Sequence, residues 1–176
     1  MITLAAFDEL SRNRAVELMQ ECCASSEWAE RMARGRPYSS LDALHQQSDD
    51  TWWHLRRDDW LEAFRAHPKI GDASRKSASR SANWSRGEQA TIVADVSAAE
   101  ELQRLNAEYE ARFGWQFILC ATGKNAADVR AAVKRRLEND EAAELREAAE
   151  EQHRITRLRL DKLFEPPTVA PIGGPR

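Results

Sequence analysis

A long run without glycine or proline, residues 140–164 (DEAAELREAAEEQHRITRLRLDKLF), most strongly constrains the fold of this chain. Its C-terminal apolar residues fall on one arc of a helical wheel, which predicts a long amphipathic helix. Glycine (7) and proline (6) are sparse in the whole chain, and an all-β fold would need many more tight turns. The length of 176 residues suits one domain with one core. We therefore expect an all-α fold, a compact single-domain helical bundle.

The rest of the chain shows the same helical periodicity, interrupted by one long gap. Further helices are predicted over about residues 7–23, around Trp28 and Met32, from about residue 39, and over residues 51–67, 88–114 and 125–139. The stretch WQFILCATG (residues 115–123) fits either buried extended chain or the start of the next helix. Residues 68–87 are weakly periodic, and a connection this long is usually functional when it is ordered. It is predicted to be an active-site loop between two helices.

The C-terminal segment EPPTVAPIGGPR, residues 165–176, is rich in proline and glycine and has no core-forming pattern. We expect a helical domain over residues 1–164 followed by a flexible tail.

Composition excludes several classes of protein. No apolar run is long enough for a transmembrane helix, and the N-terminus has no signal-peptide pattern. The three cysteines, Cys22, Cys23 and Cys120, have no CxxC spacing, so neither a zinc site nor a disulfide framework is expected. A reducing cytoplasmic location fits best. The net charge of -3 gives no global attraction to nucleic acid or to a membrane surface.

The segment FRAHPKIG places His67 at the predicted end of a helix, directly before Pro68. A histidine at a helix C-terminus can simply be favoured by the helix dipole. Proline, however, restricts the backbone of the residue before it, and a rigid helix end is a good mount for a catalytic imidazole. Imidazole titrates near neutral pH and therefore suits proton transfer.

The segment WSRGEQ, at the other end of the predicted loop, has two interpretations. Ser85 and Glu88 have the spacing of a helix capping box, and this structural interpretation is slightly favoured from the residues alone. In the functional interpretation, Glu88 and Gln89 lie at a helix N-terminus, where free N–H groups attract an anion.

Arg159 falls within the apolar arc of the last predicted helix, whereas Arg157 falls on the opposite side. An arginine on a core-facing arc needs a partner, because an unpaired buried charge is costly. The partner is either a glutamate of the same protein or a substrate carboxylate.

The remaining charged residues suggest no metal chemistry. The predicted loop is locally basic, which is typical of a solvated loop but also suits the steering of a small anion. The other histidines, His45, His54 and His153, have no metal-ligand spacing. Phosphate-binding and nucleophile-elbow motifs are absent as well.

An ordered set of short motifs carries a family resemblance. These are CCASSEWAERM, RPY, HPKIG, SRGEQ, EYEARFGWQFILCATGK and RITRLRL. Each motif is weak by itself, whereas the ordered set is specific. By it the chain resembles, over nearly its whole length except the tail, the 2-oxo-4-hydroxy-4-carboxy-5-ureidoimidazoline (OHCU) decarboxylases of urate degradation. The resemblance implies an all-α bundle, no metal or organic cofactor, an anionic ureide substrate, and in many members a homodimer.

The resemblance also assigns site residues, position by position. His67 matches the catalytic histidine, and Glu88 belongs to the matching S-x-x-E-Q binding segment and takes a catalytic role in the hypothesis below. The residues assigned to substrate binding are Pro68, Ser85, Gln89, Ile118, Leu119, Cys120, Ala121, Thr122 and Arg159. The choice of Arg159 agrees with the helical wheel. Thr122 stands where many members of the family carry a basic residue, which leaves open how the ureido or carboxylate end of the substrate is held.

The resulting hypothesis is the cofactor-independent conversion of OHCU to (S)-allantoin and CO2. His67 would deliver the proton, and Glu88 would orient the substrate hydroxyl or polarise His67. Two alternatives belong to other classes. A non-catalytic protein-binding module would expose an apolar groove, and a ureide hydrolase would need a nucleophile–base pair or a metal set that the sequence does not show.

Overall fold

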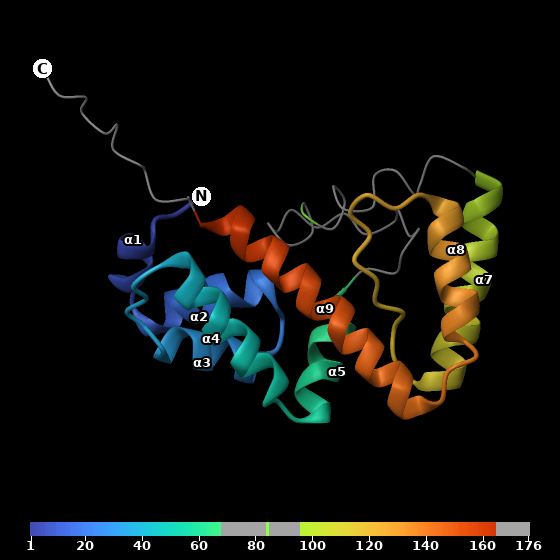
Figure 1. The fold of residues 1–176 in the computed structure, drawn as a ribbon, viewed down its shortest axis with the longest axis horizontal. Coiled ribbons are helices and arrows are strands. Elements are labelled where there is room, and N and C mark those ends of the chain that lie inside the picture. The colour runs from blue at the N-terminus through green and yellow to red at the C-terminus, as the bar shows by residue number, and fades with distance from the viewer. Residues whose placement is uncertain (68–83, 85–95, 165–176) are drawn as a thin grey trace, which may run out of the picture.

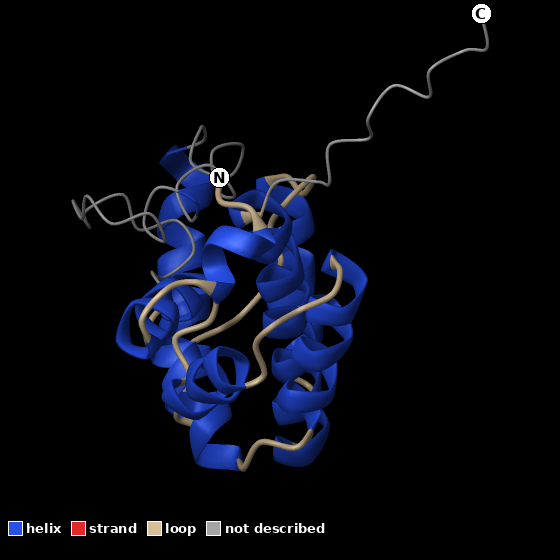
Figure 2. Cartoon of the chain, turned by 90° about the vertical axis from the view of Figure 1, so that its left-hand side faces the viewer, coloured by secondary structure: helices blue, strands red, loops and turns tan. Residues whose placement is uncertain are grey.

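The computed structural model describes residues 1–67, Trp84 and residues 96–164. The helices are α1 (Leu4–Asp8), α2 (Arg12–Cys22), α3 (Ser26–Arg34), α4 (Leu41–Trp53), α5 (Arg57–Arg65), α7 (Val96–Phe113), α8 (Ala126–Arg136) and α9 (Glu141–Leu163). Helices and loops account for the described part of the chain (Figure 2), which confirms the predicted all-α fold. Apart from Trp84, the predicted loop over residues 68–87 lies outside the described residues, and so does the predicted tail over residues 165–176.

Helix α9 connects two groups of helices (Figure 1). Helices α2, α3 and α4 pack together at one end, and α7 and α8 form a pair at the other. Helix α9 starts beside the α7–α8 pair and runs across the molecule to contact α2, α4 and α5. The prediction of a long helix ending at residue 164 is confirmed, since α9 begins after Asp140 and ends at Leu163.

Large aromatic and sulfur-containing side chains fill the core. Trp28, Trp52 and Tyr109 are almost completely buried and come from three different helices. The indole N–H of Trp52 donates to the carbonyl of Ala149 on α9, at 3.0 Å, so α4 is joined to α9 by a polar contact as well as by packing. Burial of each such ring stabilises the fold by roughly 1.5–3 kcal/mol.

Short polar side chains begin most of these helices by accepting hydrogen bonds from otherwise unpaired backbone N–H groups. The capping residues are Thr3, Ser11, Ser25, Ser40, Asn125 and Asp140. Asn125 and Asp128 form a reciprocal capping box at the start of α8, as their spacing predicts. Gly114 follows α7 with φ 81°, the left-handed conformation that glycine adopts without a steric penalty.

Two predicted helices are wrong because each is divided in the structure. The helix predicted over residues 7–23 is interrupted after Asp8, and Ser11 caps a new helix, α2. The helix predicted over residues 51–67 is interrupted after Trp53, and α5 begins after Arg56. There the carboxylate of Asp59 accepts the Arg56 N–H at 3.0 Å, which starts α5 without glycine or proline as a signal.

The two ends of the described chain meet. The N–H of Ile2 donates to the carbonyl of Leu163 at 2.9 Å, and Ile2 and Phe164 form an isolated parallel bridge. Phe164 packs edge-on against Phe7, so this junction is anchored in the core. Within the described residues, no helix combines the length and the apolar content needed to span a bilayer.

Candidate active site

The structure describes part of the predicted site. His67, Arg159 and the segment from Ile118 to Thr122 belong to the described residues. Pro68, Ser85, Glu88 and Gln89 lie outside them, and their assignments stay predictions. The described part consists of a helix end, an inward-facing arginine and an extended segment held by buried charges.

His67 lies immediately after the C-terminal end of α5. The last helical residue is Arg65, and the backbone N–H of His67 still donates to the carbonyl of Phe64, at 3.2 Å. The side chain is half-buried, and Phe64 below it is fully buried in the core. The imidazole is therefore mounted on an anchored helix end, where the dipole of the helix favours a positive charge.

Arg159 lies on the buried face of α9 and is only 4% exposed, as the helical wheel predicts. Its guanidinium charge acts on the thiol of Cys23, at the end of α2, and Thr156, one turn earlier on α9, hydrogen-bonds that thiol. Arg157 points to the other side, where it is paired with Asp49 of α4 at 2.5 Å. The two arginines thus have different surroundings although they are nearly adjacent in sequence.

The Cys23 thiol is almost fully buried among groups from four elements. Burial raises the pKa of Cys23 to about 11, while hydrogen bonds from the Ser25 backbone and the Thr156 side chain and the charge of Arg159 act in the opposite direction. The negative charge of Glu62 on α5 also raises this pKa. The charges of both Glu62 and Arg159 act on Cys23. Three elements therefore converge at this thiol: the start of α3, helix α5, which precedes His67, and the face of α9 that carries Arg159.

Glu62 also fixes the start of α3. Its carboxylate accepts the backbone N–H of Ser26 at 3.0 Å and the hydroxyl of the same serine at 2.6 Å. Carboxylates are stabilising at helix N-termini because the N–H groups there are unpaired and the dipole is positive. The contact ties α5, and hence the helix end that carries His67, to the CCASSEW motif.

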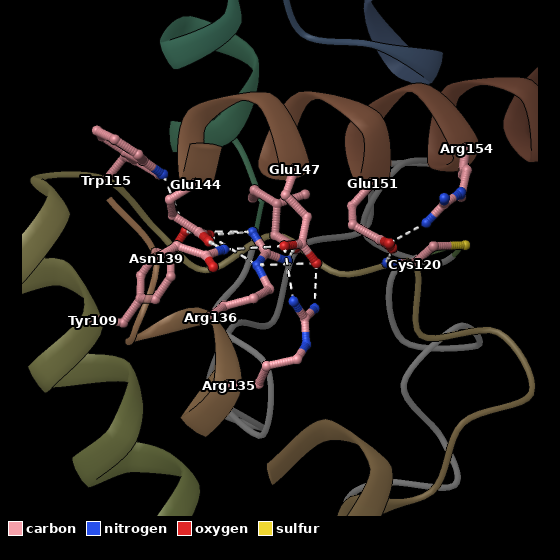
Figure 3. Close-up of polar contacts among 11 residues, drawn as sticks. Tyr109, Trp115, Cys120, Arg135, Arg136, Asn139, Glu144, Glu147, Glu151 and Arg154 are labelled. Atoms are coloured by element: carbon pink, nitrogen blue, oxygen red, sulfur yellow. Dashed lines mark hydrogen bonds and ion pairs between the residues drawn. The ribbon is translucent and has the colours of Figure 1, made fainter. Parts of the chain in front are cut away.

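The segment from Trp115 to Ala121 is extended and lies between α8 and α9, so the expectation of buried extended chain is confirmed and that of a helix start is wrong. The guanidinium of Arg136 donates to the carbonyl of Ile118 at 2.6 Å. The carboxylate of Glu151 accepts the backbone N–H of Cys120 at 2.8 Å (Figure 3). Ile118, Leu119 and Ala121 are buried, Cys120 is half-buried and Thr122 is exposed.

A tight turn ends this segment. The N–H of Lys124 donates to the carbonyl of Ala121 at 3.0 Å, and Gly123 adopts φ 78° within the turn. A positive φ at the third residue of such a turn is the usual reason for a glycine there. Thr122 therefore lies on an exposed turn directly before α8.

Buried charges at the α8–α9 contact support the extended segment (Figure 3). Arg136 and Glu144 are both completely buried and form an ion pair, in which Glu144 accepts the Nε–H of Arg136 at 2.8 Å. Glu144 also accepts hydrogen bonds from the Tyr109 hydroxyl and, at 2.9 Å, from the Asn139 amide. The guanidinium of Arg136 lies 4.6 Å from the centre of the Phe117 ring. Such extensive pairing is what a buried charge requires.

Tyr109 connects this ion pair to the aromatic core. Its hydroxyl accepts the indole N–H of Trp115 at 3.2 Å and donates to Glu144. Burial raises the pKa of the Tyr109 hydroxyl far above its ordinary value, and the hydrogen bond to Glu144 raises it further although Arg136 opposes the effect. The hydroxyl therefore stays protonated and serves as a hydrogen-bond donor.

Sequence reasoning missed Arg136, Glu151 and Cys23. Arg136 lies two helical turns after Val129, on the same buried face of α8, so an inward arginine was detectable by the reasoning that selected Arg159. Glu151 stands in an acidic run, in which composition alone does not distinguish it from Glu147 and Glu150. The described residues contain no group of three or more His, Cys, Asp or Glu side chains that could hold a metal ion.

Comparison with known proteins connects this geometry to a family. The model of the OHCU decarboxylase family matches residues 8–161. A uric acid degradation bifunctional protein of Arabidopsis thaliana is 42% identical over 146 residues, which are 81% of this chain and 45% of that protein's length. A 2-oxo-4-hydroxy-4-carboxy-5-ureidoimidazoline decarboxylase of Haloferax volcanii is 33% identical over 93% of this chain and 96% of its own.

A solved structure agrees with these sequence relatives. The crystal structure of an OHCU decarboxylase in the presence of (S)-allantoin superposes with a TM-score of 0.73 at 38% identity, covering 82% of this chain and 95% of that one. The chain spans less than half of the bifunctional Arabidopsis protein but nearly all of the Haloferax protein. By the family model, by sequence and by structure, this chain belongs to the OHCU decarboxylase family.

Proposed function

We propose that this protein decarboxylates OHCU to (S)-allantoin and CO2 without a metal or organic cofactor. The observation that carries the proposal is Arg159, a cation on the buried face of α9 in a chain of the OHCU decarboxylase family. A guanidinium with little access to water suits recognition of a small anionic ureide. The extended segment around Leu119 supports the same proposal, because backbone amides are suited to the polar edges of a ureide ring.

The chemistry requires the stabilisation of charge and the delivery of one proton. When the C–C bond to the carboxylate breaks, its electron pair stays on the former C4 carbon, next to a ring carbonyl that delocalises it. A proton then replaces CO2 on that carbon, and delivery to one face gives a single enantiomer. In our proposal His67 donates this proton, and Glu88 orients the substrate hydroxyl or polarises His67.

The decisive experiment follows the reaction of freshly generated OHCU with the purified protein. We expect CO2 to be released faster than in the absence of protein. We also expect the allantoin to be the S enantiomer, because spontaneous decay gives a racemic product. The rate of CO2 release and the circular dichroism of the product are the measurements. Racemic allantoin at the spontaneous rate would exclude decarboxylation and favour a protein-binding module, whereas consumption of allantoin would indicate a hydrolase.

The role of His67 is tested by His67→Asn, compared with His54→Asn as a matched control on the exposed end of α4. General acid–base catalysis contributes about 10²–10⁴-fold, so we expect His67→Asn to lose at least about 10²-fold in kcat at an unchanged Tm. The control variant should keep its kcat. A folded His67→Asn protein with a near-normal rate would refute the proposed proton donor without affecting the proposed overall reaction.

The resemblance implies in addition a homodimer, and the cysteine pattern favours a reducing cytoplasm. These two expectations stay predictions, and sedimentation of the purified chain over a range of concentrations checks the first of them.

A further inference from the structure

Two charged side chains hold consecutive peptide groups of the extended segment. Arg136 donates to the carbonyl of Ile118 at 2.6 Å, and Glu151 accepts the N–H of Cys120 at 2.8 Å. Both side chains approach from the α8–α9 side, because Glu147, one turn before Glu151 on α9, lies 3.8 Å from Arg136 (Figure 3). The residue between the two held groups is Leu119.

The planarity of the peptide bond fixes the direction of the Leu119 backbone groups. In a trans peptide the carbonyl of one residue and the N–H of the next point in opposite directions. The Ile118 carbonyl points to Arg136, so the Leu119 N–H points away from Arg136. In the same way the Cys120 N–H points to Glu151, so the Leu119 carbonyl points away from Glu151. A donor and an acceptor of one residue thus both face away from the charged side.

These two groups are available for a ligand. Within the described part of the chain, neither the N–H nor the carbonyl of Leu119 makes a hydrogen bond. Leu119 is only 8% exposed, and a buried backbone group without a partner costs roughly 1–3 kcal/mol. A bound molecule that supplied both partners would remove this cost.

The charges also strengthen the two groups. A cation that holds the Ile118 carbonyl polarises the peptide group and makes its N–H, on Leu119, a better donor. An anion that holds the Cys120 N–H makes the carbonyl of the same peptide group, on Leu119, a better acceptor. The signs of Arg136 and Glu151 are therefore both the favourable ones for this pair.

We infer that Arg136 and Glu151 are positioning residues, which turn the N–H and the carbonyl of Leu119 together toward the substrate. The pair matches the edge of a ureide or lactam, in which a carbonyl and an N–H stand side by side. This inference rests on the proposed function for the identity of the ligand, whereas the orientation of the two peptide groups does not depend on it.

The test compares Glu151→Gln and Glu151→Ala with the matched control Arg154→Ala. A glutamine can still accept the Cys120 N–H, whereas alanine cannot. Arg154 pairs with the other carboxylate oxygen of Glu151 and its side chain is 59% exposed, so its loss leaves the Cys120 contact in place. Amide hydrogen exchange, followed by NMR, reports on Cys120 and Leu119 separately, and (S)-allantoin is the binding probe.

In the wild type we expect the Cys120 amide to be protected without ligand. The Leu119 amide should shift and become protected only when (S)-allantoin is added. Glu151→Ala should lose the protection at Cys120 and raise KM for OHCU about tenfold, the factor for one hydrogen bond to a charged group, with a smaller change in kcat. Glu151→Gln should restore most of the Cys120 protection and bring KM back close to the wild-type value. Arg154→Ala should match the wild type in both measurements.

Two results would overturn the inference. One is a Leu119 amide that stays unchanged in wild-type protein saturated with (S)-allantoin, a measurement that needs no variant. The other is a folded Glu151→Ala protein that keeps the wild-type KM. If the wild-type protein neither binds (S)-allantoin nor decarboxylates OHCU, both the proposed function and the ligand assignment are refuted. Comparison of the Cys120 amide exchange rate in the wild type and in Glu151→Ala then still decides whether Glu151 holds this peptide group.

Discussion

Cys23 illustrates how burial changes the role of a reactive side chain. The thiolate is the reactive form of cysteine, and the raised pKa of about 11 leaves roughly one thiol in a thousand ionised at pH 8. The thiol is also only 1% exposed. Cys23 therefore acts beside Arg159 as a neutral packing and hydrogen-bonding group and not as a nucleophile.

The three cysteines should differ in their rates of alkylation. With iodoacetamide at pH 8, we expect Cys120, which is half-buried, to be modified first, while the buried Cys22 and Cys23 resist. Mass spectrometry of tryptic peptides over time measures the order, and the same reaction in urea provides the control, in which all three react. Equal labelling of Cys23 and Cys120 in the folded protein would contradict the burial and the raised pKa of Cys23.

Helix α9 shows how one element combines two charged regions. Glu144 and Glu151 lie two turns apart on its buried face, where Ala148 and Ile155 also lie. Arg159 follows on the same face, two turns after Glu151. Because an α-helix is stiff and rises about 1.5 Å per residue, the distance of roughly 12 Å along the helix between the Cys120 contact and Arg159 is set by the helix itself.

The buried ion pair between α8 and α9 should show strong coupling. Arg136→Leu or Glu144→Leu alone leaves an uncompensated buried charge, so each should lower the free energy of unfolding by about 3–5 kcal/mol. The double variant should be more stable than either single one, because it leaves neither charge behind. Urea unfolding followed by circular dichroism measures all three.

The exposed pair of Arg57 and Glu141, at 2.8 Å, is the control for this comparison. Leucine at either of these positions should change the unfolding free energy by about 1 kcal/mol or less, and the changes should add. If the double variant at Arg136 and Glu144 lost the sum of the two single losses, the pair would not behave as one buried unit.

The elements differ in how well the sequence predicts them. The last helix and the start of α8 were predictable because periodicity and an Asn–Asp capping box act locally. The division at residues 54–56 was not, because Trp53 and Trp60 keep a helical spacing across it, while the break depends on Asp59 and on the Trp60 indole, which donates to the Trp52 carbonyl at 3.0 Å. These contacts need a folded neighbourhood, which spacing does not reveal.

At the scale of the whole molecule, the site depends on pairings between distant parts of the chain. The helical wheel predicted that Arg159 faces inward, because the direction of a side chain on a helix follows from the apolar pattern of that helix alone. It could not predict that Glu151 takes the Cys120 N–H or that Arg136 takes the Ile118 carbonyl, since neither pairing leaves a spacing signal. The family resemblance pointed to the 118–122 segment, and the structure adds which side chains hold part of it.

Global stability should depend on pH through Glu147, on the half of α9 that contacts α8. Hydrogen bonds from Arg135 lower the pKa of Glu147 below its ordinary value, and Arg136 and Asn139 act in the same direction. A lowered pKa in the folded state gives stability that is present above the unfolded pKa, about 4.3, and is lost as pH falls through the folded value.

We therefore expect Glu147→Gln to lower the unfolding free energy at pH 7 by about 1 kcal/mol or less, a Tm shift of about 2–4 °C at most. The difference in unfolding free energy between Glu147→Gln and the wild type should become smaller as the pH falls below about 4. Thermal unfolding at a series of pH values measures it, with Glu150→Gln, at the exposed 3.3 Å pair with Arg146, as the control. A difference that grew toward low pH would have the wrong sign.

The contact between Ile2 and Leu163 has a consequence for how this domain can be combined with others. A chain that enters and leaves a folded unit at one point can be joined to another domain at either end, or inserted into a surface loop of one, without rearranging the helices. The same closeness makes the domain suited to circular permutation, in which a short linker joins the old ends and new ends open elsewhere. The bifunctional Arabidopsis relative, of which this chain matches 45% of the length, is compatible with such a combination.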